Sequence, residues 1–325
     1  MATVIGDTNA TLKDLTLIAE NTVAQTRPNL YPLICSVKPE DGAYTKIPIA
    51  ANMPFPILFE GARKSKGKDV TVVQNYNQGT YELTIDLDSD LVRNAKAYDQ
   101  SDLVQEATMA AVLFPDYVAS QAVISGGTNL AYDGVAFYGS THKYAKAGSI
   151  TIDNTVSKTT QDVAGLANDL ASALTKIRTF RDNAGRLLNP LASYGKEKLL
   201  IHCPVCLEQK FRQVIFGSTI PISVPVTTSG TLAVGGISNV AWSGVADLFA
   251  DGYLDAATSN PTTTWYLHYV GMPQRPFVFL ENYGIQVTVL GLGSEHEVNT
   301  NTIRIALKHR FVLGYYRFDR SARVA

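Results

Sequence analysis

The chain has 325 residues, of which 46% are hydrophobic, enough to bury a substantial core in one large domain or two smaller ones. Its 28 basic and 29 acidic residues give a formal net charge of -1, which excludes a global basic field that would recruit nucleic acid or anionic membranes. Three cysteines argue against a disulfide framework and fit a reducing compartment. The first residues form no signal peptide and no run of about 18 apolar residues occurs, so neither secretion nor membrane spanning is expected.

The N-terminal part predicts a helix in an arm, followed by a projecting hairpin. Apolar residues recur at helical spacing from Thr11 to Thr26, and prolines then favour an extended segment. Strand-like stretches at Ala43–Ala50 and Val70–Tyr76 flank the segment Gly61–Lys68, whose four basic residues and two glycines suit an exposed loop tip.

The next region predicts a half-buried strand and a long helix. Apolar and polar residues alternate over Thr80–Asp88, so one face of this strand is expected to be buried. Apolar residues from Leu103 to Ile124 lie along one helical stripe that ends at Gly126. Pro115 lies inside this helix and is expected to kink or divide it.

The middle of the chain predicts mixed α/β layers. An amphipathic helix covers Gln161–Arg181, and a short strand at Lys198–His202 leads through Pro204 into a helix that Gly217 closes. The segment from Ser218 to Gly244 is rich in Ser, Thr, Gly and Val and predicts a long loop or a small ribbon.

The C-terminal third returns to strands with alternating apolar residues. The expected strands are Trp265–Val270, Pro276–Glu281, Ile285–Leu290 and Thr302–Phe318.

Two ion-binding motifs are each incomplete. Gly61–Lys68 has five residues between its glycines where a phosphate-binding loop has four, and Asp69 follows the lysine where the loop needs Ser or Thr. Asp86, Asp88 and Asp90 resemble the start of a calcium loop, but the sequence lacks the glycine and the bidentate glutamate that the loop requires. We interpret the first as a solvated basic tip and the second as a strand end before a helix N-terminus.

The run His202-Cys-Pro-Val-Cys206 is the motif most suggestive of chemistry. A thiol at a helix N-terminus has a lowered pKa, and CxxC serves redox and zinc sites. Because no second pair follows, we favour buried small side chains, with a redox or metal enzyme as the low-ranked alternative. His142 could act as a base, but no partner acid can be identified and no nucleophile elbow is present.

Basic residues interleave with apolar ones near the C-terminus. These residues could touch phosphate, and the same alternation is equally that of a solvated sheet face. They are Arg304, Lys308, Arg310, Arg317 and Arg320.

A set of motifs in fixed order resembles the Mu-like phage major head subunit family. They are Glu60-Gly-Ala-Arg63, Tyr81-Glu82 with the acidic stretch that follows, Tyr132-Asp-Gly-Val-Ala-Phe137, Ser140-Thr-His142, the helix at Gln161–Arg181, Trp265-Tyr-Leu267 and the basic aromatic end near Tyr315–Arg320. The resemblance covers most of the chain beyond Ala43. Phe59-Glu60 stands where the family has a tryptophan and Lys143 where it has a proline, so this chain resembles a divergent relative.

The resemblance implies an α+β fold of the Hong Kong 97 capsid type. The implied segments are an N-terminal arm (1–42), an extended hairpin loop (43–88), a spine helix with part of the peripheral domain (89–159), an axial domain (160–260) and peripheral-domain strands (261–325). The implied function is that of a major capsid protein of a tailed double-stranded DNA phage, assembled in the host cytoplasm into an icosahedral virion shell.

The implied partners are other copies in hexamers and pentamers, a separate scaffold, a portal, decoration proteins, and packaged DNA by weak non-specific contact. No catalytic, cofactor or metal site is expected. Arg63, Lys64, Lys66 and Lys68 are the expected intersubunit contacts. An encapsulin-like nanocompartment shell is the alternative within the same fold.

Overall fold

The computed structural model describes residues 4–40, 44–50, 70–93, 98–144, 150–192, 198–223, 234–239, 242–256, 263–291 and 293–325. The helices are α1 (Val4–Gln25), α2 (Tyr31–Ile34), α3 (Ser89–Arg93), α4 (Tyr98–Ser125), α5 (Val163–Thr179), α6 (Val205–Phe216), α7 (Gly252–Ala256) and α8 (Glu295–Thr300), with a 3-10 turn η1 (Phe318–Arg320). The strands are β1 (Cys35–Pro39), β2 (Tyr44–Ala50), β3 (Val70–Asn77), β4 (Gly79–Asp88), β5 (Thr155–Val156), β6 (Leu199–Pro204), β7 (Thr219–Ser223), β8 (Val234–Ser238), β9 (Asp247–Asp251), β10 (Trp265–Tyr269), β11 (Phe277–Leu290), β12 (Thr302–Tyr315) and β13 (Ser321–Val324).

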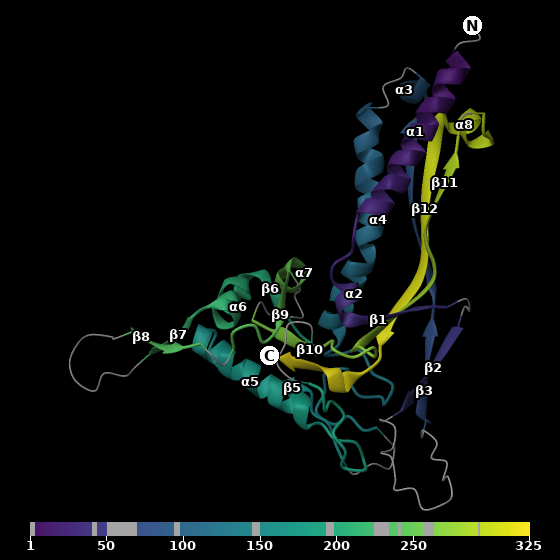
Figure 1. The fold of residues 1–325 in the computed structure, drawn as a ribbon. Helices are drawn as coiled ribbons and strands as arrows, with labels where there is room; N and C mark the ends of the chain where they lie inside the picture. Colours follow the sequence, from purple (N-terminus) through teal and green to yellow (C-terminus); the bar gives the residue numbers. More distant parts are fainter. Residues whose placement is uncertain are drawn as a thin grey trace, which may run out of the picture.

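The long half of the molecule is a four-stranded sheet with two long helices beside it. The strand order is β1-β11-β12-β4, and α4 and α1 run along this sheet (Figure 1). The predicted arm helix is confirmed and begins earlier than expected, at Val4. Its Leu15 and Ala19 are buried in one cluster with Leu87 of β4 and Ile305 of β12, so the helix belongs to the core of this half.

The predicted long helix is continuous through Pro115. The proline lies within α4, a single helix of 28 residues, so the expected division does not occur. A proline inside a helix costs about 3 kcal/mol, because one backbone hydrogen bond is lost and the ring crowds the preceding turn. The apolar side chains that α4 buries before and after it, such as Val112 and Ala119, offset that cost.

The residue after the proline joins the arm to α4. The carboxylate of Asp116 accepts hydrogen bonds from the backbone N–H groups of Asn29, Leu30 and Tyr31 at 2.6, 3.1 and 2.8 Å. These groups lie at the start of α2, where backbone donors lack partners within the helix. Asp116 therefore fixes the point at which the arm turns from α1 toward β1.

Two predicted strands near the C-terminus are one strand. Residues 277–290 form β11, which pairs antiparallel with β12 along its length, with an irregular register between Glu281 and Gln286. Residues 282–284, which lie between the two predicted strands, belong to this irregularity. They interrupt the apolar alternation in the sequence, and the sequence therefore predicted two strands instead of one. The predicted strand 302–318 is confirmed as β12, but it ends at Tyr315.

The other half contains a five-stranded mixed sheet in the order β5-β13-β10-β6-β9. Both predicted helices, α5 and α6, are confirmed and pack on this half (Figure 1). The apolar residues that recur at helical spacing in α5 and α6 are buried; they are Val163, Ala167, Leu170, Leu174, Ile177, Leu207, Phe211 and Ile215. Phe211 meets Trp265 of β10 edge-on, with ring centroids 4.9 Å apart.

Two antiparallel ribbons extend from these halves. β2 pairs with β3, as the predicted hairpin requires, and β7 pairs with β8 within the predicted loop or small ribbon. The amide of Asn239, buried at the base of the second ribbon, donates to the carbonyl oxygens of Val214 and Gly217 at 2.6 and 2.8 Å. The Asn239 side chain thereby ties this ribbon to the end of α6.

A buried ion pair marks the crossover between the two sheets. The chain leaves β12, turns through η1 and enters β13, and at this turn Arg317 and Asp319 form a bidentate pair with N–O distances of 2.8 and 2.9 Å. Both side chains are buried, and the hydroxyl of Tyr144 donates to the same carboxylate at 2.5 Å. Burial opposes ionisation of Asp319, but the charge and hydrogen bonds of Arg317 outweigh it and lower the pKa of the carboxyl group.

The substitution Asp319→Asn is expected to destabilise the protein by about 3–5 kcal/mol, because it leaves the buried Arg317 guanidinium without a counter-charge. Urea unfolding measures this free energy. The control is Glu208→Gln, which breaks the more exposed Glu208–Arg212 pair and is expected to cost at most about 1 kcal/mol. Equal losses in the two variants would contradict a structural role for the crossover pair.

Candidate functional sites and exposed surfaces

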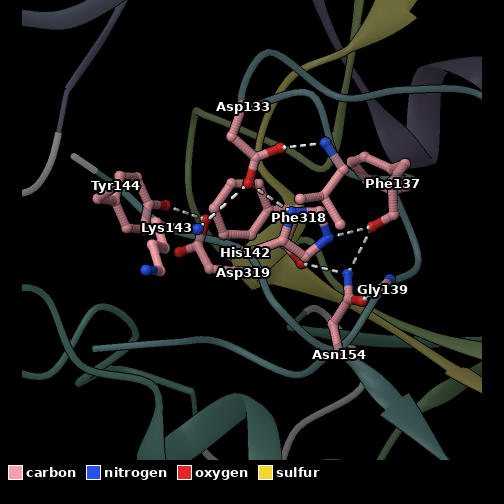
Figure 2. Close-up of polar contacts among 10 residues, drawn as sticks. Asp133, Phe137, Gly139, His142, Lys143, Tyr144, Asn154, Phe318 and Asp319 are labelled. Carbon is pink, nitrogen blue, oxygen red and sulfur yellow. Dashed lines mark hydrogen bonds and ion pairs between the residues drawn. The ribbon is translucent and has the colours of Figure 1, made fainter. Parts of the chain in front are cut away.

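His142 lies in a buried node that joins the loop after α4 to the C-terminal crossover. Its Nδ1 lies 2.8 Å from Oδ2 of Asp133 and its Nε2 lies 3.1 Å from the carbonyl oxygen of Phe137 (Figure 2). The ring stacks on Phe318 with centroids 4.1 Å apart. Both ring nitrogens thus lie within hydrogen-bond distance of acceptor oxygens inside the protein. Neither nitrogen is left to act as a base.

The partner acid that the sequence analysis could not identify is thus Asp133, which lies in the Tyr132–Phe137 motif. Burial opposes ionisation of Asp133, but the hydrogen bond and charge of His142, together with backbone N–H groups of Val135 and Lys143, outweigh it and lower the pKa of this carboxyl group. Asn154 completes the node by donating to the carbonyl oxygens of Phe137 and Phe318 at 2.8 and 3.1 Å.

The node is expected to make stability depend on pH. Since the pKa of Asp133 is lowered in the folded state, its contribution is present at neutral pH and is lost as the pH falls through the folded-state pKa. The variant Asp133→Asn lacks this contribution, so its deficit in unfolding free energy should be largest at pH 7 and should shrink in acid. Urea titrations at a series of pH values measure the deficit, and a deficit that does not change with pH would contradict the assignment.

A second buried histidine joins α4 to the five-stranded sheet. The hydroxyl of Ser120 and Nε2 of His202 both contact Oδ2 of Asp251, at 2.5 and 2.9 Å. A hydrolytic triad needs the serine hydrogen-bonded to the histidine, whereas here the aspartate lies between them. All three side chains are buried. This contact could not be predicted from the sequence because its members are far apart in the chain. The geometry of the contact supports packing of α4 on β6 and β9.

The CxxC cysteines lack the environment of a reactive thiolate. Burial raises the pKa of the Cys203 thiol, and burial together with a hydrogen bond to Asp255 raises that of Cys206. Asp255 also accepts the backbone N–H of Val205 at 2.6 Å, so a carboxylate already lies at the N-terminus of α6. The expectation of core packing is confirmed for Cys203 and wrong for Cys206, which is exposed.

Thiol labelling tests this description. At pH 7 a thiol reagent should react slowly with Cys206 and not with Cys203 in the folded protein, and the rate at Cys206 should rise as the pH approaches the pKa of an ordinary thiol. Full reaction of both thiols should occur only in denaturant. Rapid labelling at pH 6 would show a stabilised thiolate and would contradict the raised pKa values.

The three aspartates at the end of β4 and the start of α3 have structural partners. Asp86 forms a bidentate pair with Arg304 at 2.7 and 2.8 Å. Oδ1 of Asp88 accepts the backbone N–H of Asp90 at 2.8 Å, at the point where β4 ends and α3 begins. The interpretation as a strand end before a helix is confirmed. Among the described residues, no group of three or more His, Cys, Asp or Glu side chains could hold a metal ion.

The C-terminal basic residues divide into two groups. Arg317 and Arg320 are buried, so both interpretations, phosphate contact and a solvated sheet face, are wrong for these two. On the exposed face of β12, Arg304 pairs with Asp86, and Lys308 lies 4.0 Å from Glu82. Acidic residues of β4 therefore lie opposite basic residues of β12, which is the pattern of a solvated sheet face.

An apolar face of α4 remains exposed. Met109, Leu113 and Tyr117 follow one another at four-residue spacing and are 39%, 38% and 40% exposed. Beside them, a groove of about 330 Å³ lies between α4 and the sheet and is lined mainly by apolar side chains, including Phe114 and Leu307. Contiguous apolar surface of this kind marks an interaction site.

Helix α4 also meets a simple test for membrane spans. Within the described part of the chain, its segment Gln100–Ser125 is the one helical stretch long and apolar enough to cross a membrane, judged by length and composition only. The core helix of a soluble protein passes the same test.

The basic residues expected to make intersubunit contacts, Arg63, Lys64, Lys66 and Lys68, lie outside the described residues. The strands on either side of them, β2 and β3, are described.

Comparison with known proteins identifies the fold. No protein-family model and no curated protein matches the sequence. A chain of the procapsid of bacteriophage JBD30 matches with a TM-score of 0.53 and 15% identity, over 97% of this chain and 75% of that one. A chain of the capsid of cyanophage P-SCSP1u matches with a TM-score of 0.53 and 12% identity, over 92% of this chain and 88% of that one.

A third structure, a virus-like particle from Pyrococcus furiosus, matches with a TM-score of 0.51 and 10% identity, over 96% of this chain and 98% of the other. At such low identities the likeness concerns the fold. Together with the element order, it confirms the expected class: the chain has an α+β fold of the Hong Kong 97 capsid type.

Proposed function

We propose that this chain is the major capsid protein of a tailed double-stranded DNA bacteriophage, a divergent relative of the Mu-like major head subunits. It self-assembles into hexamers and pentamers of an icosahedral head. The observation that carries this proposal is the match to the JBD30 procapsid chain over 97% of the present chain. The buried histidine nodes and the raised pKa values of the two CxxC thiols agree with a structural role, because His142 and His202 are engaged in packing.

The division into functional segments follows the element order. We assign residues 1–42 to an arm, 43–88 to an extended hairpin loop, 89–159 to the spine helix and adjoining structure, 160–260 to an axial domain and 261–325 to peripheral strands. The β2–β3 ribbon, which projects from the body, supports the hairpin assignment (Figure 1). Because β4 pairs with β12, the part of this segment free to reach a neighbour is the part before β4.

The proposed partners follow from this role. Copies of the chain meet through many repeated interfaces, and symmetry multiplies the stabilisation that each one contributes. A separate scaffold, a portal and decoration proteins complete the virion, which is assembled in the host cytoplasm. Packaged DNA makes weak, non-specific contacts, consistent with a net charge of -1 and with the paired charges on β12.

A second candidate is an encapsulin-like nanocompartment shell. The chain spans 98% of the virus-like particle chain, and this near-complete coverage is the observation behind the second candidate. The contents of purified particles separate the two candidates. Protein cargo held by a targeting peptide supports the nanocompartment, and packaged double-stranded DNA in particles from infected cells supports the phage head.

Charge reversal in the hairpin loop tests the proposed function. The double variant Lys64→Glu, Lys66→Glu is expected to lower the yield of shells seen in electron micrographs, because it removes two cations from the proposed intersubunit contact. The subunit should remain folded, with an unchanged urea midpoint. The matched control is the conservative variant Lys64→Arg, Lys66→Arg, which should assemble. Unchanged shell yield in the Glu variant would contradict the assignment of this loop.

A further inference from the structure

A buried arginine at the crossover has unpaired hydrogen-bond donors. Arg320 is the last residue of the turn η1 and is 1% exposed. Its Nε and Nη1 atoms have no hydrogen-bond partner in the described part of the chain. A guanidinium group stays charged in proteins, and buried charges are as a rule paired or bound to an ion. The two donors of this buried cation therefore call for an acceptor.

The charges at this turn do not cancel. Asp319 attracts both Arg317 and Arg320. Its carboxylate already accepts two hydrogen bonds from Arg317 and one from Tyr144. Two arginines thus share one aspartate, which leaves one positive charge in excess. Burial and the like charge of Arg317 lower the pKa of Arg320, as expected of a cation without a counter-charge of its own.

A third unpaired donor lies beside Arg320. Strands β10 and β13 are antiparallel and pair His268 with Ser321, so Tyr269 and Arg320 follow at the same end of this ladder. The hydroxyl of Tyr269 is buried and, among the described residues, has no hydrogen-bond partner. The charge of Arg320 acts on this hydroxyl and opposes the rise in its pKa that burial causes. Arg320 and Tyr269 therefore bring three unpaired donors to one buried place.

The chemistry of these donors selects a small anion as their ligand. An anion accepts hydrogen bonds from all three groups, and one negative charge balances the excess positive charge of the turn. A water molecule would supply an acceptor but no charge. Because Arg320 and Tyr269 are 1% and 0% exposed, the site has no room for a side chain of a second copy or for an organic ligand.

We propose that Nε and Nη1 of Arg320, together with the hydroxyl of Tyr269, bind a small monovalent inorganic anion of the chloride type. The anion neutralises the second arginine of the crossover, as Asp319 neutralises the first. The site lies within the folded subunit, so this inference goes beyond the proposed capsid function and does not depend on it.

The chloride dependence of stability tests this site. Urea unfolding of the full-length subunit is measured at about 20 mM and about 200 mM chloride, with sodium gluconate holding the ionic strength constant. An anion that binds the folded chain alone favours folding by mass action. The folding equilibrium constant of the wild-type chain should rise several-fold, and by no more than roughly tenfold because one anion binds.

Three variants assign the effect to the site. Arg320→Met should abolish the chloride dependence, because it removes both guanidinium donors and the charge. Tyr269→Phe, which keeps the ring, should weaken the dependence. The matched control is Arg212→Met, which changes the net charge equally but removes an exposed arginine paired with Glu208, and should respond to chloride as the wild-type chain does. Equal chloride dependence in the wild-type and Arg320→Met chains would overturn the proposal.

Bromide locates the anion without any variant, so the proposal stays testable where Arg320→Met does not fold. Crystals of the wild-type chain grown in sodium bromide should give an anomalous difference peak within hydrogen-bond distance of the Arg320 guanidinium. Water density at this position, without an anomalous peak, would show that the donors bind water only and would sink the proposal.

Discussion

The structure depends on the buried crossover at which the chain passes from the long sheet into the five-stranded sheet. Arg317 and Asp319 neutralise each other there, and Tyr144 and Asn189 bind the same turn, through the Asp319 carboxylate and backbone carbonyl respectively. A buried ion pair contributes little net stability compared with apolar packing, but removing one partner is costly. The pair therefore strongly favours the one arrangement of the turn in which both charges are satisfied.

A second set of polar contacts joins α4 to the five-stranded sheet and to the arm. Ser120 reaches Asp251 beside β6, and Asp116 binds the start of α2. Side chains that resemble catalytic groups, such as His202 and Asp251, therefore serve to hold elements of the fold together. Rigid joints of this kind suit a subunit that must present the same surfaces in every copy, while the exposed face of α4 and the β2–β3 ribbon remain available for contact.

Much of the fold was predictable where burial follows a simple period. The prediction of the amphipathic helix α5 was correct, and so was that of a strand leading through Pro204 into α6. In both places the spacing of apolar residues follows one buried face. At Pro115 the sequence predicted a kink or a break, but packing of α4 against the rest of the fold keeps the helix continuous. The site was less predictable: Asp251 and His202 are 49 residues apart, and neither residue's local sequence indicates the other. The prediction that Cys206 is buried was wrong because the buried stripe of α6 runs through Leu207, Phe211 and Ile215, and Cys206 lies one position before this stripe.

Cryo-electron microscopy of the purified wild-type chain, concentrated under assembly conditions, tests the central claim most directly. The account predicts closed icosahedral shells, or rings of five and six subunits. A chain that stays monomeric at high concentration, with its α4 face open to solvent, would contradict it.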